Sequence, residues 1–356
     1  MTEPANDESN PENCHINNPY YGADKYINPD YAALVETSIA ESSDPDLVAK
    51  MRSVQNSPTA IWLDRIESIP GGDLNHGRSS LEQHFINALA QQRKAVPMLI
   101  ELVVYNLPNR DCAALSSNGT LDYRTGGLDI YKRAYIDPVA TLIEAPRFAA
   151  LRIVIILEPD SLPNMITNLW HSECAFVNNH DVYLQGIQYA IERLTPATNS
   201  YIYMDIGHSG WLGWDKHLTS AVAYFSKVIA GAKTGKGLSA VDGFITNISG
   251  TTPTEEPFLS NSDMKIDGTS IKSADFYEWN RILDEKSYVE ALYRRLVQAG
   301  FPCDLNFLID TSRNGWGGIN RPSTTSSATK LNDYVDQSRI DRRFHRGNWS
   351  TLAAQA

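Results

Sequence analysis

Short apolar runs alternate with helical patterns from about residue 60 onward, and this alternation constrains the fold more than any other feature of the chain. The runs are rich in Val, Ile, Leu and Tyr and lack strict alternation, as expected for strands that are buried on both faces of a parallel sheet. They occupy residues 60–63, 98–105, 152–157, 201–204, 243–246 and 305–309. Strand–helix repetition predicts a parallel α/β architecture, and one continuous barrel fits better than two domains because no Pro/Gly/Ser-rich linker divides the repeats.

A helical pattern begins after the first of these runs. Ser79 and Glu82 have the spacing of a capping box, and Leu81, Phe85 and Leu89 then recur every fourth residue on one face. Further helical patterns occupy residues 181–194, 217–231 and 285–299. These segments complete the alternation of strands and helices that an α/β barrel requires.

Two long polar stretches lack this periodicity. They cover residues 251–277 and 311–329 and are rich in Ser and Thr. Each follows a predicted strand, so we expect both on the same face of the barrel. Loops of this length inside a compact domain usually act as lids or binding loops.

Charge and hydropathy exclude two classes of partner. The chain has 356 residues and a formal net charge of -11 at pH 7, whereas a nucleic-acid partner would need a basic face. No apolar run reaches the roughly 18 to 20 residues that span a bilayer, so no membrane partner is expected. Residues 1–13 are polar and acidic, which predicts a disordered leader that lacks the features of a signal peptide. We expect a monomer.

Polar side chains follow each predicted strand at its carboxyl end, where the βα loops of a parallel barrel gather and form the active site. In chain order they are Trp62, Asp64 and Arg65, then Tyr105, Arg110 and Asp111, then Glu158 and Asp160, then Asp205 and His208, then Asn247, and finally Asp310 and Arg313. Acidic residues at these positions can also cap helices, but five of the six strand ends carry one. The sequence therefore predicts an acidic site on this rim.

Aromatic residues surround the same rim. They are Trp62, Tyr105, Trp211, Trp214, Trp316 and Trp349. Carboxylates among exposed aromatic rings suit carbohydrate binding, because sugar rings stack on indoles and their hydroxyl groups need planar hydrogen-bonding partners. The alternative is that several of these Trp side chains belong to the core, since Trp is highly buried on average.

Two other kinds of site are disfavoured. The segment GHSGW resembles the GxSxG nucleophile elbow, but Trp211 stands at the fifth position in place of Gly, so serine-hydrolase chemistry at Ser209 is not expected. The residues His171, His180 and His208 lack the spacing of a metal site, and we expect neither a metal nor another cofactor.

The four cysteines leave the redox setting open. Cys14, Cys112, Cys174 and Cys303 lie far apart and form no CxxC pair or zinc-binding cluster. They are either four buried thiols or include at least one long-range disulfide, which would indicate an oxidising compartment.

Five segments carry a family resemblance. They read VVYNLPNRDCAALSSNG, LEPDSLPN, MDIGHSGWLGW, DTSRNGWGG and DRRFHRGNW. In this order they resemble glycoside hydrolase family 6, the inverting β-1,4-glucanases, and are most similar to its bacterial exo-acting cellobiohydrolases. The resemblance implies a distorted parallel (β/α) barrel. It implies a catalytic domain over residues 14–349, followed by a tail over residues 350–356.

The resemblance also assigns catalytic roles. It implies that Asp160 is the general acid that protonates the leaving glycosidic oxygen, and that Asp111 keeps Asp160 protonated because two carboxylates in one site cannot both ionise cheaply. Tyr105 matches the residue under the scissile sugar that favours its distortion. Ser117 matches the residue that helps to position the attacking water.

The implied substrate is cellulose and its cello-oligosaccharides. The expected binding residues are Trp62, Asp64, Arg110, Asp205, His208, Trp211, Trp214, Asn247 and Trp349. The family's disulfide between two catalytic loops would join Cys112 to Cys174, which favours secretion. The two long polar loops match those that roof the tunnel of exo-acting members, and this favours release of cellobiose over internal cuts.

The sequence departs from the family after GNW. The family places a cysteine there and continues through a final strand that carries the usual candidate for the catalytic base, whereas this chain has Ser350 and ends in TLAAQA. We therefore expect the final strand and its C-terminal segment to be missing, and no base is named. The alternatives are a catalytically impaired glucan-binding protein and an endo-β-1,4-glucanase.

Overall fold

The computed structural model describes residues 15–114, 116–248 and 250–345. The chain divides into two compact units. Unit 1 takes its described residues from Met1–Arg110, Gly119–Glu158 and Gln185–Ile202. Unit 2 takes them from Asp111–Asn118, Pro159–Leu184 and Tyr203–Ala356. This division was not predicted, because the chain passes between the units several times without a linker.

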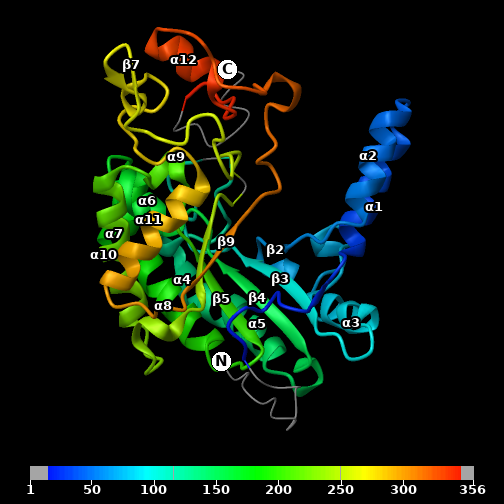
Figure 1. The fold of residues 1–356 in the computed structure, drawn as a ribbon. Coiled ribbons are helices and arrows are strands. Elements are labelled where there is room, and N and C mark those ends of the chain that lie inside the picture. The colour runs from blue at the N-terminus through cyan, green and yellow to red at the C-terminus, as the bar shows by residue number, and fades with distance from the viewer. Residues whose placement is uncertain (1–14, 115, 249, 346–356) are drawn as a thin grey trace, which may run out of the picture. The chain divides into compact units, whose positions relative to one another are not determined.

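Unit 1 is built on strand β3, Met98–Val104, which pairs in parallel with three other strands. These strands are β1 (Asp24–Lys25), β2 (Ile61–Leu63) and β4 (Leu151–Leu157). The register of β3 and β4 is level, so that both strands end side by side (Figure 1). Nearly all of their residues are buried, which confirms the prediction of strands that are covered on both faces.

Helix α3, Leu81–Gln91, packs against β3 and β4 through its apolar face. The predicted capping box was placed one residue too early. The N-cap is Ser80, whose hydroxyl accepts a hydrogen bond from the Gln83 N–H, whereas Ser79 donates to the carboxylate of Asp30. Adjacent serines satisfy the spacing rule almost equally well, so the pattern fixed the helix but not its cap.

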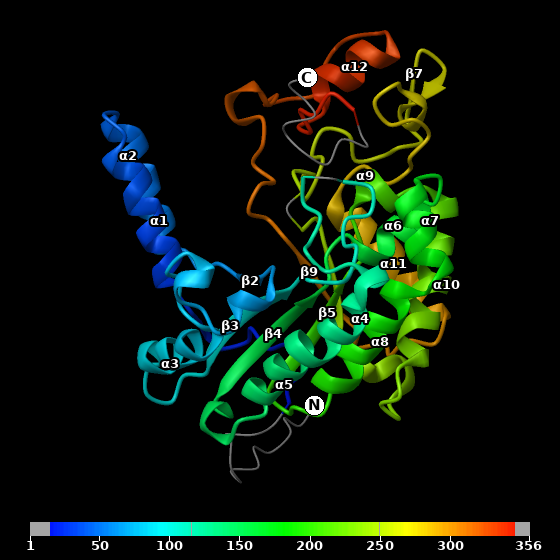
Figure 2. The ribbon, with the colours of Figure 1, turned by 180° about the vertical axis from the view of Figure 1, so that it is seen from behind.

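A helical run of three parts lies beside β4 (Figure 2). It consists of α4 (Gly127–Ile130), the π-helical turn η4 (Tyr131–Ile136) and α5 (Asp137–Ile143). A π-helical turn inside an α-helix frequently marks a functional position. Here it places the side chains of Tyr131 and Tyr135 in the buried interior of the unit.

Besides the run α4–η4–α5, a pair of exposed helices in unit 1 was not predicted. They are α1 (Pro29–Ala40) and α2 (Pro45–Gln55), which pack against each other. Each begins at a side-chain cap, Asn28 and Asp44, followed by proline at the first helical position. Their side chains are mostly exposed, so they lack the apolar stripe on which the sequence prediction relied.

Strand β5, Ser200–Asp205, begins in unit 1 and ends in unit 2. In unit 2 it pairs with β6 (Gly243–Thr246), which pairs in turn with β9 (Asn306–Ile309). All three run parallel, and these strands belong to the same sheet as β1 to β4. The six predicted strands therefore form, each with boundaries within one residue of the prediction.

The helices of unit 2 lie before, between and after these strands in the chain. They are α6 (Ser161–Thr167), α7 (Ser172–Asn179), α9 (Ser209–Leu212), α10 (Asp215–Gly231), α11 (Glu285–Gln298) and α12 (Leu331–Ser338). Helix α8, Val182–Leu194, starts in unit 2 and continues into unit 1. The helices α10 and α11 pack side by side (Figure 1). Short 3₁₀ turns occupy Ile66–Ser68, Asp73–Asn75, Tyr123–Thr125, Pro146–Phe148, Gly237–Ala240, Ile271–Ser273 and Gly318–Asn320.

The first long polar stretch is more ordered than its sequence suggested. It contains the hairpin of β7 (Lys265–Ile266) and β8 (Thr269–Ser270). It also has a small core of its own, formed by Leu259, Ile271, Ala274, Phe276, Tyr277 and Leu283 together with Tyr334 and Val335 of α12. The apolar residues that build this core are irregularly spaced in the sequence and therefore produce no periodic signal.

Side-chain contacts tie the two polar stretches to each other and to the following segment. The Asn314 amide donates to the Thr254 hydroxyl. The buried carboxylate of Glu256 accepts hydrogen bonds from the N–H groups of Ile340 and Asp341, both at 2.8 Å. Within the described residues, no helix is both long enough and apolar enough to cross a membrane.

Candidate active site

Several residues at the ends of strands or beyond them hold a left-handed backbone, among them Asp111, Glu158, Asp160 and Asn247. The φ angles are 50° at Asp111, 48° at Glu158, 60° at Asp160 and 63° at Asn247. Side chains with a Cβ atom rarely adopt this conformation, and residues held in it cluster at active sites. Backbone strain therefore falls on the same rim that the polar residues had indicated.

Unit 2 contains three neighbouring carboxyl groups, Asp160, Asp205 and Asp111, which we call the carboxyl cluster. The Asp160 N–H donates to Asp205 Oδ2 at 2.8 Å, and the Gly207 N–H donates to Asp205 Oδ1 at 3.1 Å. Asp205 and Asp111 are each 3% exposed, whereas Asp160 is half-buried. The cluster thus combines two buried carboxyl groups with one that solvent or a ligand can reach.

Burial and charge keep Asp160 protonated. Burial raises the pKa of Asp160 well above its ordinary value, and the negative charges of Asp205 and then Asp111 raise it further. Burial also raises the pKa of Asp205 to about 7, although the N–H groups of Asp160 and Gly207 donate to its carboxylate. The sequence had named only Asp111 as the partner of Asp160, and Asp205 proves to have the larger electrostatic effect.

A disulfide anchors the segment that carries Asp111. Cys112 and Cys174 are joined with an S–S distance of 2.03 Å, which confirms the predicted pairing. The bond ties the segment Asp111–Asn118 to α7. Cys303 is an exposed free thiol, so the alternative of four buried thiols is wrong, and Cys14 lies outside the described residues.

Unit 1 gathers Trp62, Asp64, Tyr105 and Arg110. The Arg110 guanidinium lies 4.1 Å from the centre of the Tyr105 ring and donates to the carbonyl oxygens of Tyr105 and Asp64. Trp62, 40% exposed, meets the Tyr105 ring edge-to-face at 5.5 Å. The tyrosine ring is thus held between a cation and an indole that faces solvent.

The Asp64 carboxylate binds within its own loop. Arg65 donates to it at 3.2 Å and Ser68 at 3.1 Å. Burial alone would raise the pKa of Asp64, but the hydrogen bond and charge of Arg65, the Ser68 hydroxyl and the charge of Arg110 outweigh it and lower that pKa. Asp64 is therefore an anion at neutral pH, unlike Asp160.

Of the predicted aromatic residues in unit 2, Trp211 and Trp214 are half-buried and fixed by their indole N–H groups, whereas Trp316 is exposed. Trp211 donates to the Thr167 hydroxyl at 2.7 Å, and Trp214 donates to the Glu278 carbonyl at 2.8 Å. His208 is buried, with its ring 6.0 Å from that of Trp211. These bonds fix the ring planes, which stacking on a sugar requires.

Comparison with known proteins identifies the family. A sequence profile of the glycosyl hydrolases family 6 matches residues 20–328. The chain belongs to glycosyl hydrolase family 6. It is 48% identical over 337 residues to exoglucanase A of Cellulomonas fimi, which covers 94% of this chain and 38% of that protein, and 33% identical to exoglucanase 3 of Agaricus bisporus, with 89% and 67% covered. The chain thus spans about two fifths of the length of the first of these relatives.

Solved structures of family 6 enzymes share the fold. The catalytic domain of Cellulomonas fimi Cel6B matches with a TM-score of 0.88 and 47% identity, over 94% of this chain and 74% of that one. Cellobiohydrolase II (Cel6A) from Humicola insolens, in complex with glucose and cellotetraose, matches with a TM-score of 0.70 and 30% identity, over 87% and 77%. The predicted fold, a parallel barrel of the family 6 type, is confirmed.

In this family 6 chain, Asn247 binds the backbone around the first long polar loop. Its side chain has no exposed surface, and its amide donates to the carbonyl oxygens of Thr252 at 3.2 Å and Asp310 at 3.0 Å. Its Oδ1 accepts from the Thr252 N–H. The side chain therefore holds the start of the loop, and its role in substrate binding stays a prediction.

Ser117 is half-buried in the disulfide-bonded segment, and Trp349 lies outside the described residues. Their predicted roles in the family 6 site stay predictions. No group of three or more His, Cys, Asp and Glu side chains among the described residues is arranged to hold a metal ion.

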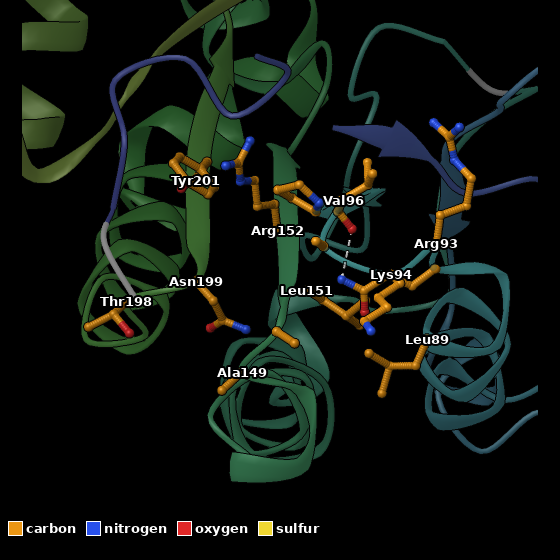
Figure 3. A pocket seen from close by; sticks show the side chains of 14 residues that line it. Leu89, Arg93, Lys94, Val96, Ala149, Leu151, Arg152, Thr198, Asn199 and Tyr201 are labelled. Carbon is orange, nitrogen blue, oxygen red and sulfur yellow. Dashed lines mark hydrogen bonds between the residues drawn. The ribbon is translucent and has the colours of Figure 1, made fainter. Parts of the chain in front are cut away.

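A cavity of about 470 Å³ lies in unit 1, far along the strands from Tyr105 and Arg110. Its lining includes Leu151, at the start of β4, and Tyr201, near the start of β5 (Figure 3). The cationic side chains Arg93, Lys94 and Arg152 also line it. The cavity therefore lies at the amino ends of the strands, whereas the catalytic residues of parallel barrels lie at the carboxyl ends. It is not the candidate active site.

Proposed function

We propose that this chain hydrolyses the β-1,4-glucosidic bonds of cellulose and cello-oligosaccharides with inversion and releases cellobiose from chain ends. The observation that carries this proposal is the carboxyl cluster, in which a half-buried Asp160 stays protonated beside Asp205 and Asp111. A glycosidic oxygen leaves poorly without a proton, so an acid kept neutral near pH 7 supplies what the reaction needs. The names of the relatives, exoglucanases and cellobiohydrolases, support the same substrate class.

Each residue of the site has a task in this proposal. Asp160 donates its proton to the leaving oxygen, and Asp205 and Asp111 hold that proton in place until the bond breaks. Tyr105 lies under the sugar that becomes distorted, while Trp62 and Trp214 bind sugar rings farther along the chain of glucose units. Ser117 helps to position the attacking water.

The exo mode of action rests on the long polar loops. The first of these loops has a hairpin and a small core, which make it ordered enough to roof a bound chain, and a roofed site favours cleavage from an end. We also propose that residues 14–349 act as one catalytic domain and that the protein is a secreted monomer. The Cys112–Cys174 disulfide supports secretion, because such bonds persist in oxidising compartments.

Hydrolysis of cellohexaose followed by NMR tests this proposal. We expect purified protein to release cellobiose first as the α-anomer, and Asp160→Asn to abolish that release. Binding of cellohexaose without release of cellobiose would instead indicate a glucan-binding protein, and release of the β-anomer would contradict inversion.

The viscosity of carboxymethylcellulose separates exo from endo action. An exo-acting enzyme lowers viscosity little for each reducing end that it forms. A steep drop in viscosity at low yields of reducing ends would contradict cleavage from chain ends and favour an endoglucanase.

A further inference from the structure

Glu158 is a buried carboxyl group that the proposed reaction does not use. It follows the last residue of β4 and is 1% exposed. Its backbone has a left-handed φ of 48°. Burying a carboxyl group and straining its backbone both cost stability, so the contacts of this side chain indicate what it is kept for.

The carboxylate of Glu158 binds the backbone of the loop that follows β3. The Asn106 N–H donates to both of its oxygens, at 3.2 and 3.1 Å, and the Leu107 N–H donates to Oε2 at 3.2 Å. The Tyr131 hydroxyl donates to Oε1 at 2.8 Å. These three donors converge on one carboxylate, which is how a protein fixes a buried turn that has no strand partner.

A second tyrosine of the π-helical turn extends this arrangement. The Tyr105 N–H donates to the Tyr135 hydroxyl at 3.0 Å, and that hydroxyl donates to the Leu63 carbonyl oxygen. Side chains from two other elements therefore bind three consecutive N–H groups, those of Tyr105, Asn106 and Leu107. We call this set of contacts the Glu158 clamp.

The clamp fixes the residue that the proposed function places beneath the reacting sugar. The Tyr105 ring lies against Trp62 and under the Arg110 guanidinium. The Arg110 guanidinium also donates to the Tyr105 carbonyl oxygen, so the ring and the backbone of this residue are restrained together. A shift of the turn would move the ring relative to both neighbours.

We propose that Glu158 is a positioning residue, whose ionised carboxylate holds the Tyr105–Leu107 turn and so places the Tyr105 ring for catalysis. The inference rests on the proposed hydrolase function, because it gives Tyr105 a role in that reaction. Glu158 itself touches no substrate in this account and acts only through the backbone that it binds.

The charged and titratable groups that face Glu158 make this positioning sensitive to pH. Burial raises the pKa of Glu158 to about 7, although the Tyr131 hydroxyl, the N–H groups of Asn106 and Leu107 and the charge of Arg110 favour its ionised form. Burial, together with the charge of Glu158, raises the pKa values of Tyr131 and Tyr135 well above the usual range, so both stay hydrogen-bond donors. Above pH 7 the carboxylate accepts all three bonds, and below it protonation removes part of that capacity.

The decisive variant is Glu158→Gln, which keeps the shape but turns amide hydrogens toward backbone N–H groups. A displacement near 1 Å at a catalytic group costs on the order of 100-fold in rate. We expect kcat on cellohexaose to fall by that order with KM changed less than about threefold. The fall in wild-type kcat below pH 7 should be absent in the variant.

Glu101→Gln is the matched control. Glu101 lies in β3 of the same unit, and its carboxylate accepts a hydrogen bond from the Tyr20 hydroxyl at 2.6 Å. The substitution therefore removes a comparable carboxylate–tyrosine bond away from the turn. We expect its kcat and its pH profile to match those of the wild type.

Hydrogen exchange separates this inference from the proposed function. Amide exchange of residues 105–107 should quicken in Glu158→Gln but not in Glu101→Gln, whether or not the protein hydrolyses cellulose. If wild-type protein does not release cellobiose, the proposed function fails while the exchange result still judges the clamp. If Glu158→Gln does not fold, Tyr131→Phe, which removes one donor and keeps the charge, should show the same exchange change to a smaller extent. Unchanged exchange at residues 105–107, or a kcat within twofold of wild type, would overturn the inference.

Discussion

Glu158 and Asp160 are two carboxyl groups two residues apart at the same strand end, yet their surroundings are opposite. Glu158 belongs to unit 1 and is met by hydrogen-bond donors, whereas Asp160 belongs to unit 2 and is met by two other carboxyl groups. In a regular strand, residues so spaced would point to the same face. Left-handed backbones at both positions break that rule. The comparison shows that backbone geometry can place nearby acids in opposite surroundings, which suit the positioning role proposed for Glu158 and the proton-donating role proposed for Asp160.

The largest expected difference between the two acids is in catalysis. Replacing Asp160 by Asn should lower kcat on cellohexaose by roughly 10²- to 10⁴-fold at every pH, because no proton reaches the leaving oxygen. Glu158→Gln should show the smaller loss given above. Steady-state kinetics of both variants on one substrate test this ranking, and equal losses would erase the distinction between the two roles.

Stability should depend on pH in the same direction through Glu158 and through Asp205, a neighbour of Asp160. The pKa values of Glu158 and Asp205 rise to about 7 in the folded protein, so between about pH 4 and pH 7 the folded state binds more protons than the unfolded state. The free energy of unfolding must therefore fall as pH rises through this range.

Urea unfolding of Glu158→Gln at pH 4.5 and pH 7.5 isolates the contribution of Glu158 to the pH dependence of the free energy of unfolding. The variant should lose less stability than wild type over the interval, by roughly 3 kcal/mol for a buried group shifted this far. An unchanged pH dependence would show that the carboxyl group is not protonated in the folded state at pH 4.5 to 7.

The disulfide holds the segment that carries Asp111, so it bears on the carboxyl cluster and not on the Glu158 clamp. Reducing Cys112–Cys174 should lower the free energy of unfolding by about 2–4 kcal/mol and lower the melting temperature, since the bond closes a long loop. Cys303→Ser, which alters only an exposed free thiol, should leave that shift unchanged. Four titratable thiols in the oxidised, denatured protein would contradict the bond.

The smallest expected effect is a difference between the pH profiles of two variants, one at Asp205 and one at Asp111. Either Asp205→Asn or Asp111→Asn removes a negative charge and lowers the pKa of Asp160. The upper pH limit of activity, above which Asp160 loses its proton, should therefore move to a lower pH. Because Asp205 acts more strongly than Asp111, its replacement should move that limit farther. The pH profiles of kcat for the two variants check the order, and a larger shift for Asp111→Asn would reverse it.

The sequence predicted the sheet well and its rim only in part. The buried runs that became β3 and β6 were read almost residue by residue, because apolar composition alone marks a strand covered on both faces. The helices α1 and α2 were missed because their side chains remain mostly exposed. Burial of apolar surface gives a periodic signal, and without it the pattern disappears.

The site shows the same limit. Asp160 and Asp111 could be named from their motifs, but the larger effect of Asp205 and the structural role of Asn247 could not. Both depend on backbone N–H and carbonyl groups that only the folded chain brings together. The left-handed conformation of Glu158 had no signal at all, since nothing in LEPDS requires it.

Two substrates with different leaving groups test whether Asp160 donates the proton. If it does, the Asp160→Asn variant should fail on a leaving group that needs a proton and work on one that does not. On cellohexaose, kcat should fall by on the order of 1,000-fold. On 2,4-dinitrophenyl β-cellobioside, whose phenolate departs without a proton, it should fall by less than about tenfold. Equal loss on both substrates would contradict the role of Asp160 as the general acid.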